Sequence, residues 1–144
     1  MRSNYNKRLF IPLKKGCKFY NGNGMYSFSV RNRLGKLHRV GAPAFMNFIK
    51  RKGCYYELVE EEWRNNGLCH RVGGPAITIK GMVQEWWYKG MRHRIDGPSI
   101  ESLTPYAEYK NVWFIMGKEY ASKQEWFEAL TREDQVAYLF KLNK

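Results

Sequence analysis

Short runs of alternating hydrophobic and polar residues recur along the chain, separated by turns that contain glycine. Residues 76–79 form one such run, residues 82–88 form the next, and Lys80-Gly81 lies between them. Alternate residues of a strand point to opposite faces of a sheet, so two such runs joined by a glycine turn predict a β-hairpin. Lys89-Gly90 predicts a further turn, because glycine adopts a positive φ angle without steric strain.

Beyond residue 121 the hydrophobic spacing becomes helical. Ser122 and Glu125 form a capping-box pattern, and Thr131 is a second candidate helix start. The apolar residues that follow are Trp126, Phe127 and Leu130 in the first segment and Val136, Ala137, Phe140 and Leu142 in the second. We predict two short helices whose apolar faces cover the open end of a sheet, since an uncovered sheet edge pairs with other chains.

One unit repeats within the chain. Its clearest copies are residues 63–77 and 86–100, which share Trp, Gly four residues later, His-Arg three residues after that, and then Gly-Pro with a small and a β-branched residue. Residues 31–45 form a weaker copy, in which Arg31 replaces the aromatic residue and Ala42 replaces the glycine before proline. Residues 113–120 form a final half-copy, in which Tyr120 replaces histidine. The copies are unevenly spaced, which favours a chain of hairpins with loops of varying length.

These patterns predict a mainly β fold. We expect tandem β-hairpin repeats that form a meandering antiparallel sheet, with a short α-helical cap at the C-terminal end. The expected organisation is a basic N-terminal segment at residues 1–30, which belongs to the same domain, a β-repeat region at residues 31–120, and a helical cap at residues 121–144.

The repeat resembles the MORN-variant family of short β repeats. More specifically, it is similar to the His-Arg-x-x-Gly-Pro-Ala repeat of small proteins from tailed bacteriophages. In that phage repeat the final copy commonly exchanges His for Tyr and runs into a helix, as Tyr120 and Trp126 do here. The resemblance implies a β-repeat fold, a viral origin and a role in binding rather than in a reaction. Residues 1–30 depart from the pattern.

The net charge of +12 is concentrated in the first part of the chain. Residues 1–56 contain 13 Lys and Arg and no Asp or Glu, whereas residues 57–144 contain 12 Lys and Arg against 13 Asp and Glu. This asymmetry favours a nucleic acid or an acidic protein as partner. Basic residues interleaved with aromatic ones are typical of proteins that bind single strands or RNA. The residues that we single out for this contact are Lys14, Lys15, Lys18, Arg31, Arg33, Lys36, Lys50, Arg51 and Lys52.

The alternative interpretation of these basic residues is a solvated surface without a partner. Glu60, Glu61 and Glu62 could pair with the basic residues and weaken any binding.

A His-Arg pair recurs at one position of the repeat. The pairs are His38-Arg39, His70-Arg71 and His93-Arg94. Stacked repeats would place them in a row, and both Arg and protonated His bind phosphate. A catalytic site is normally needed only once, so recurrence favours a role in the repeat architecture. We expect these pairs to be structural, with ligand contact as the alternative.

The recurring tryptophans Trp63, Trp86 and Trp113 predict a shared core along the repeats. Trp87 and Tyr88, which only one copy has as a doublet, are better candidates for an exposed face.

Neither a catalytic site nor a metal site is expected. The sequence contains no nucleophile elbow, phosphate loop or dinucleotide fingerprint. Cys69 has no cysteine counterpart in the other copies, so we expect a small buried residue rather than a zinc ligand. Three cysteines without a Cys-x-x-Cys pair favour a reducing compartment. We expect no cofactor, no small-molecule substrate and, without an apolar run of spanning length, no membrane insertion.

The sequence therefore predicts a non-enzymatic phage-type accessory binding protein in the host cytoplasm, whose basic N-terminal part contacts nucleic acid or an acidic host protein. A minor structural component of a virion is one alternative, in which the sheet edge and the basic segment contact other phage proteins. A phosphate-processing enzyme that uses the His-Arg pairs is the second alternative.

Overall fold

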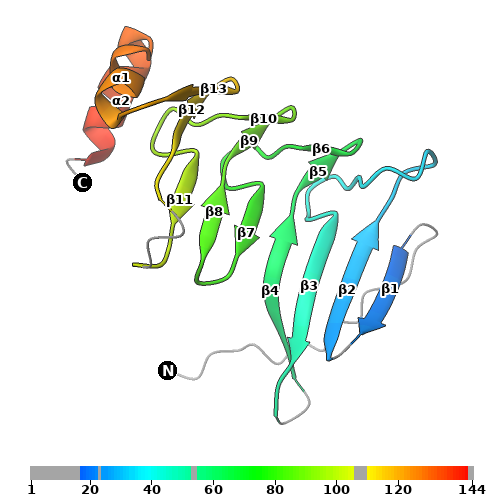
Figure 1. Cartoon of the computed structure of the whole chain (residues 1–144). Helices are drawn as coiled ribbons and strands as arrows, with labels where there is room; N and C mark the ends of the chain where they lie inside the picture. Colours follow the sequence, from blue (N-terminus) through cyan, green and yellow to red (C-terminus); the bar gives the residue numbers. More distant parts are fainter. Residues whose placement is uncertain (1–16, 23, 53–54, 106–109, 143–144) are drawn as a thin grey trace.

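The computed structural model describes residues 17–22, 24–52, 55–105 and 110–142, and it is mainly β, as predicted (Figure 1). A seven-stranded sheet has the order β1-β2-β3-β4-β7-β8-β11, and all neighbouring strands in it are antiparallel. Its strands are β1 (Cys17–Gly22), β2 (Met25–Val30), β3 (Phe45–Lys50), β4 (Tyr56–Glu62), β7 (Ile77–Ile79), β8 (Val83–Glu85) and β11 (Ile100–Ser102). The described residues of the basic N-terminal segment thus continue the sheet of the repeats.

Three short hairpins form a row along one side of this sheet (Figure 1). They are β5 (Arg64–Asn65) with β6 (Leu68–Cys69), β9 (Trp87–Tyr88) with β10 (Met91–Arg92), and β12 (Trp113–Ile115) with β13 (Lys118–Tyr120). The single strand predicted at residues 82–88 is therefore wrong, because it is divided between β8 and β9. Trp86 interrupts it: its N–H donates to the carbonyl of Ser99 and its carbonyl accepts from the N–H of His93.

Two residues with positive φ form the tip of each short hairpin. At the middle tip these are Lys89 (φ 49°) and Gly90 (φ 83°), which confirms the turn predicted there. Two consecutive positive φ angles suit the right-handed twist of a tight hairpin. The other tips are built from Asn66-Gly67 and Met116-Gly117.

The weaker first copy is aligned one residue away from the predicted position. Val30, rather than Arg31, occupies the place of the repeat tryptophan, since its N–H donates to the carbonyl of Ala44 as the N–H of Trp63 donates to Ala76. The turn of this copy is wider, with the Asn32 side chain accepting from the N–H groups of residues 34 and 36. The sequence alignment of the copies counts back from the turn glycine. This turn has one more residue than the others, so the count stops at Arg31 instead of Val30.

The small residue after each repeat proline is fully buried. These residues are Ala44, Ala76 and Ser99. The N–H of each donates to a carbonyl of the neighbouring segment, at Glu62 in β4, at Glu85 in β8 and at Val112 just before β12. A larger side chain would have to displace that segment, so the repeat requires a small residue here.

The helical cap begins as predicted. Helix α1 (Lys123–Glu128) is capped by the Ser122 hydroxyl, which accepts from the N–H of Glu125 at 3.1 Å. Helix α2 (Arg132–Leu142) follows Thr131, whose hydroxyl accepts from the N–H of Asp134 at 3.2 Å. The two helices pack around the fully buried Trp126, together with Leu130 and Tyr138.

The apolar face predicted for the second helix is wrong. Val136, Phe140 and Leu142 are exposed in the structure, and the buried residue of α2 is Tyr138. Tyr138 packs edge-on against Trp126, with the ring centroids 5.2 Å apart. An amphipathic aromatic residue thus faces the core, and the apolar residues predicted for the core face outward. No helix in the described part of the chain is long and apolar enough to cross a membrane.

Candidate functional site

The candidate basic residues form two separate groups, which lie at opposite ends of the neighbouring strands β2 and β3. Antiparallel pairing places Met25 beside Ile49 and Ser29 beside Phe45, so the end of β2 lies next to the start of β3. One group follows β2, the other follows β3, and a six-residue strand separates them by roughly 20 Å. The first group contains Arg31, Arg33 and Lys36, and the second contains Lys50, Arg51 and Lys52. Lys14 and Lys15 lie outside the described residues, and for Lys18 only the backbone in β1 is described.

A carboxylate partly neutralises the second group. The Arg51 guanidinium pairs with Glu57 at 2.6 Å, and Lys80 pairs with the other oxygen of the same carboxylate. The hydrogen bonds from Lys80 and then Arg51 lower the pKa of Glu57. One of the three cations that we singled out here is therefore already partnered, which leaves Lys50 and Lys52.

The first group has no carboxylate partner in the part of the chain that the structure describes. The Arg31 guanidinium donates to the carbonyl of Gly35 at 2.9 Å, and both Arg33 and Lys36 are exposed. The glutamates expected to weaken the basic surface bind elsewhere. Glu60 accepts from Asn47, Glu61 from Trp63 and Arg71, and Glu62 from Arg64.

The repeat histidines join successive copies of the unit. In each, Nδ1 accepts a hydrogen bond from the first positive-φ residue of the next hairpin tip. The donors are the N–H groups of Asn66 to His38 at 3.2 Å, of Lys89 to His70 at 3.2 Å and of Met116 to His93 at 3.3 Å. An imidazole with a free Nδ1 lone pair is needed for this contact, because imidazolium offers only donors.

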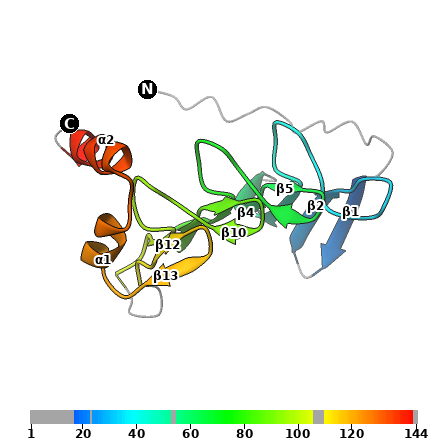
Figure 2. The same cartoon turned by 90° about the horizontal axis from the view of Figure 1, so that it is seen from above.

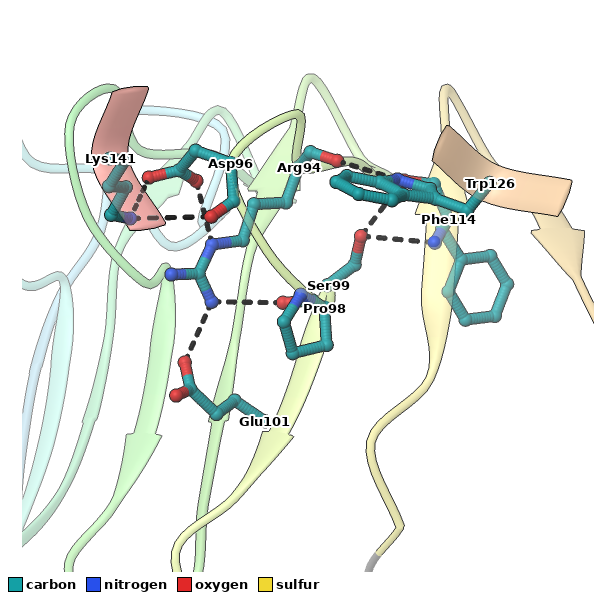
Figure 3. A network of polar contacts seen from close by, with 8 residues as sticks. All are labelled: Arg94, Asp96, Pro98, Ser99, Glu101, Phe114, Trp126 and Lys141. Atoms are coloured by element: carbon teal, nitrogen blue, oxygen red, sulfur yellow. Dashed lines mark hydrogen bonds and ion pairs between the residues drawn. The ribbon is translucent and has the colours of Figure 1, made fainter. Parts of the chain in front are cut away.

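The repeat arginines hold the loop that precedes each proline. Arg94 lies over the Trp86 ring with its Cζ 3.5 Å from the centroid. Figure 3 shows its other contact, in which the guanidinium donates to the carbonyl of Pro98 at 3.0 Å. A Cβ added at Gly97 would lie 2.8 Å from that Cζ, so the guanidinium fits only beside a glycine. The second copy repeats this arrangement with Arg71 3.9 Å from the centroid of Trp63 and a Cβ at Gly74 3.1 Å from Cζ.

Arg39 of the first copy is held less closely than Arg71 and Arg94. It has no tryptophan beneath it, it lies 5.8 Å from the Phe28 centroid, and its contact to the carbonyl of Pro43 is long, at 3.4 Å. The first copy accordingly tolerates Ala42 where the others have glycine. Ion pairs differ in the same way: the arginines of the second and third copies have carboxylate partners, and Arg39 has none among the described residues. The pairs are Arg71 with Glu61 at 3.5 Å and Arg94 with Asp96 at 2.8 Å and Glu101 at 2.7 Å.

No family model, curated protein or solved structure matches this chain. The functional argument therefore depends on the geometry of the described residues.

The recurring tryptophans do not form the one shared core that we predicted along the repeats. Trp63 and Trp86 are half-buried beneath their arginines, and Trp113 packs on Trp126 with centroids 4.6 Å apart. The exposed face expected for Trp87 and Tyr88 is also wrong. Both residues are half-buried, and Tyr88 lies between two repeat histidines, with its centroid 5.1 Å from that of His70 and 6.1 Å from that of His93.

A groove of about 410 Å³ lies between the loops of the first and second copies. Its walls include Arg39 and Arg71 together with Val40 and Val72, which are 86% and 78% exposed. Sequence reasoning missed this groove. The sequence did contain a signal, because a β-branched residue follows His-Arg in all three copies. Each of these residues lies in a loop rather than in a predicted strand, so an apolar side chain there is a candidate for an exposed contact.

Cys69 is a small buried residue, as predicted, and burial raises the pKa of its thiol. A thiol that resists ionisation is a poor nucleophile and a poor metal ligand. Among the described residues, no group of three or more His, Cys, Asp or Glu side chains is placed to hold a metal ion.

Lowering the pH is expected to destabilise the protein through His93. Burial lowers the pKa of His93, and the carboxylate of Asp134 opposes this only in part. The unfolded chain, where histidine has a pKa of about 6.5, therefore binds the proton more tightly than the folded chain. The stabilisation is fully present above about pH 6.5 and is lost as the pH falls toward the lowered value. Thermal unfolding at pH 7.5 and 5.5 should show a larger loss for the wild type than for His93→Gln; an equal loss would contradict this prediction.

Proposed function

We propose that this is a non-enzymatic, phage-type accessory binding protein that contacts nucleic acid through the basic turn of its first repeat. This first-repeat basic turn consists of Arg31, Arg33, Lys36 and Arg39. The observation that carries the proposal is the contrast between copies: these cations have no carboxylate partner among the described residues, whereas the arginines of the later copies do. Cations that remain exposed and unpaired are available to phosphate groups.

The hydrogen bonds made by the repeat histidines argue against catalysis at the His-Arg pairs. Each Nδ1 already accepts from a backbone amide of the next hairpin, and each of these contacts lies at 3.2–3.3 Å. A general base must have its acceptor nitrogen free to receive a proton from substrate. The His-Arg row therefore favours an architectural role, with the nucleic acid held at the turn beside it.

Arg33→Gln with Lys36→Gln is expected to weaken binding to single-stranded RNA and DNA. Each lost phosphate contact should reduce the slope of log K against log salt by about 0.7. The matched control is Lys50→Gln with Lys52→Gln, which removes the same charge from the opposite end of the sheet. Fluorescence titrations at two salt concentrations measure both variants.

Two results would contradict the proposal. Equal losses in the two double variants would show a general effect of net charge rather than a site at the first-repeat basic turn. No binding of the wild type at low salt would direct the search to an acidic protein partner in the host or the virion.

A further inference from the structure

Helix α2 carries an apolar stripe on its outer side. Successive residues of an α-helix are rotated by about 100°, so Val136, Leu139 and Phe140 lie together on the side opposite the buried Tyr138. All three are exposed, and Phe140 is the most exposed of them at 70%. A contiguous exposed apolar surface is typical of an interaction site.

A second exposed apolar surface lies on the loops of the first two copies. Val40 and Val72 project from successive loops on the two sides of the groove described above. The corresponding residue of the third copy, Ile95, is only 38% exposed. The loops of all three copies rise on the same side of the molecule, and α2 lies next in the row beyond the third (Figure 2).

The chain itself shows how α2 contacts a loop of this kind. Lys141 pairs with the carboxylate of Asp96 in the third loop and also donates to its backbone carbonyl at 3.3 Å (Figure 3). Gly41 and Gly73 replace Asp96 in the first and second loops, so those loops lack the carboxylate that pairs with this lysine. They present instead the exposed valines and Arg39, which has no ion-pair partner among the described residues.

We propose that these two surfaces bind each other between two copies of the chain, with Phe140 of one copy entering the groove between Val40 and Val72 of another. The two loops lead into β3 and β7, which are two strand spacings apart, or roughly 9.5 Å. An aromatic ring fits between two branched side chains held at that distance. Arg39 at the groove wall then lies near the Phe140 ring and can make a cation–π contact with it. Arg71 makes a contact of the same kind with Trp63, at 3.9 Å from the ring centroid.

Charge favours this head-to-tail arrangement over a symmetric one. Residues 1–56 contain no acidic residue, whereas the cap at residues 121–144 contains four Asp and Glu and four Lys and Arg and is therefore neutral. Pairing the loops of two copies with each other would bring two basic surfaces together. A contact between different surfaces is heterologous, so it adds further copies at each end as the concentration rises.

Sedimentation of two complementary variants tests the proposal. Phe140→Asp removes the aromatic residue but leaves the groove, and Val72→Asp blocks the groove but leaves the helix. Wild-type protein should associate with increasing concentration, and each variant alone should associate at least about 30-fold more weakly, as expected for loss of a central contact residue. An equimolar mixture of the two variants should form a one-to-one dimer that does not grow further. Leu103→Asp, at an apolar residue 45% exposed elsewhere, should associate like the wild type.

Several results would overturn the proposal. The proposal is contradicted if the wild type stays monomeric at all concentrations. It is also contradicted if the mixture of the two variants stays monomeric. Continued association of Val72→Asp on its own would indicate a symmetric contact between helices instead. Circular dichroism checks that both variants fold; Phe140→Ser and Val72→Ser repeat the experiment without a new charge. Arg39 belongs both to the groove wall and to the first-repeat basic turn, and Val72→Asp places a carboxylate in that groove. The two serine variants leave every charge of the turn unchanged, so their results distinguish failure of self-association from failure of nucleic-acid binding.

Discussion

Replacing Trp126 with alanine is expected to lower the free energy of unfolding by about 3–5 kcal/mol, the usual cost of truncating a buried tryptophan. Trp126 is fully buried, and its ring contacts those of Trp113 and Tyr138 at centroid distances of 4.6 and 5.2 Å. Its indole N–H also donates to the carbonyl of Arg94 at 3.2 Å, which links α1 to the third loop (Figure 3). The variant therefore leaves a cavity in the cap and also a carbonyl without its donor.

Urea unfolding followed by circular dichroism measures this loss. Leu139→Ala is the matched control, because it shortens an apolar side chain on the outer side of the neighbouring helix. Its effect should stay within about 0.5 kcal/mol. Similar losses in the two variants would show that the helical cap does not depend on the core around Trp126.

Gly97→Ala is expected to cost about 1–3 kcal/mol, although it adds only one methyl group. The new Cβ would lie 2.8 Å from the Cζ of Arg94, whose side chain is only 11% exposed. The guanidinium cannot move without losing its contacts to Trp86 and to the carbonyl of Pro98. Displacing a buried, paired charge is costly because the lost contacts are not replaced by water.

Two further variants test the cause of this loss. Ala42→Gly makes the reverse change in the first copy, where no arginine is held so closely, and should cost at most about 1 kcal/mol through the added freedom of the unfolded chain. Gly97→Ala combined with Arg94→Leu should add little to the loss from Arg94→Leu alone. Full additivity of the two changes would show that Arg94 is not the reason for glycine at this position.

The local features of the sequence predicted the fold class and most of the turns. The Lys89-Gly90 turn and the caps at Ser122 and Thr131 were correct because each depends on residues close together in the chain. The first copy was misaligned by one residue, since nothing in a local pattern reveals that its turn at Asn32 is wider. Residues 82–88 were predicted as a single strand but form two, β8 and β9, in different sheets. Alternation of hydrophobic and polar side chains does not show where a strand leaves its sheet.

The candidate site was predicted less well than the fold. The basic residues were correctly singled out as cations, but only the pairing of β2 with β3 shows that they form two groups. Glu57, which partners Arg51, is distant from Lys80 in sequence and meets it only through the fold. The helix face around Val136 and Phe140 was assigned to the core for a similar reason: helical spacing identifies a stripe, but packing decides which side is covered.

The sequence by itself determined the repeat, the hairpin tips, the helix starts and the excess of positive charge before residue 57, because each of these is a property of neighbouring residues or of composition. The tertiary structure alone decided which charges are neutralised and which apolar residues stay exposed. An ion pair or a packed side chain depends on distances between residues far apart in the chain, and those distances exist only once the strands are paired. Arg39 and Arg94 show this clearly: they occupy the same position of the same repeat, yet one is left without a carboxylate partner among the described residues and the other is held by Asp96 and Glu101.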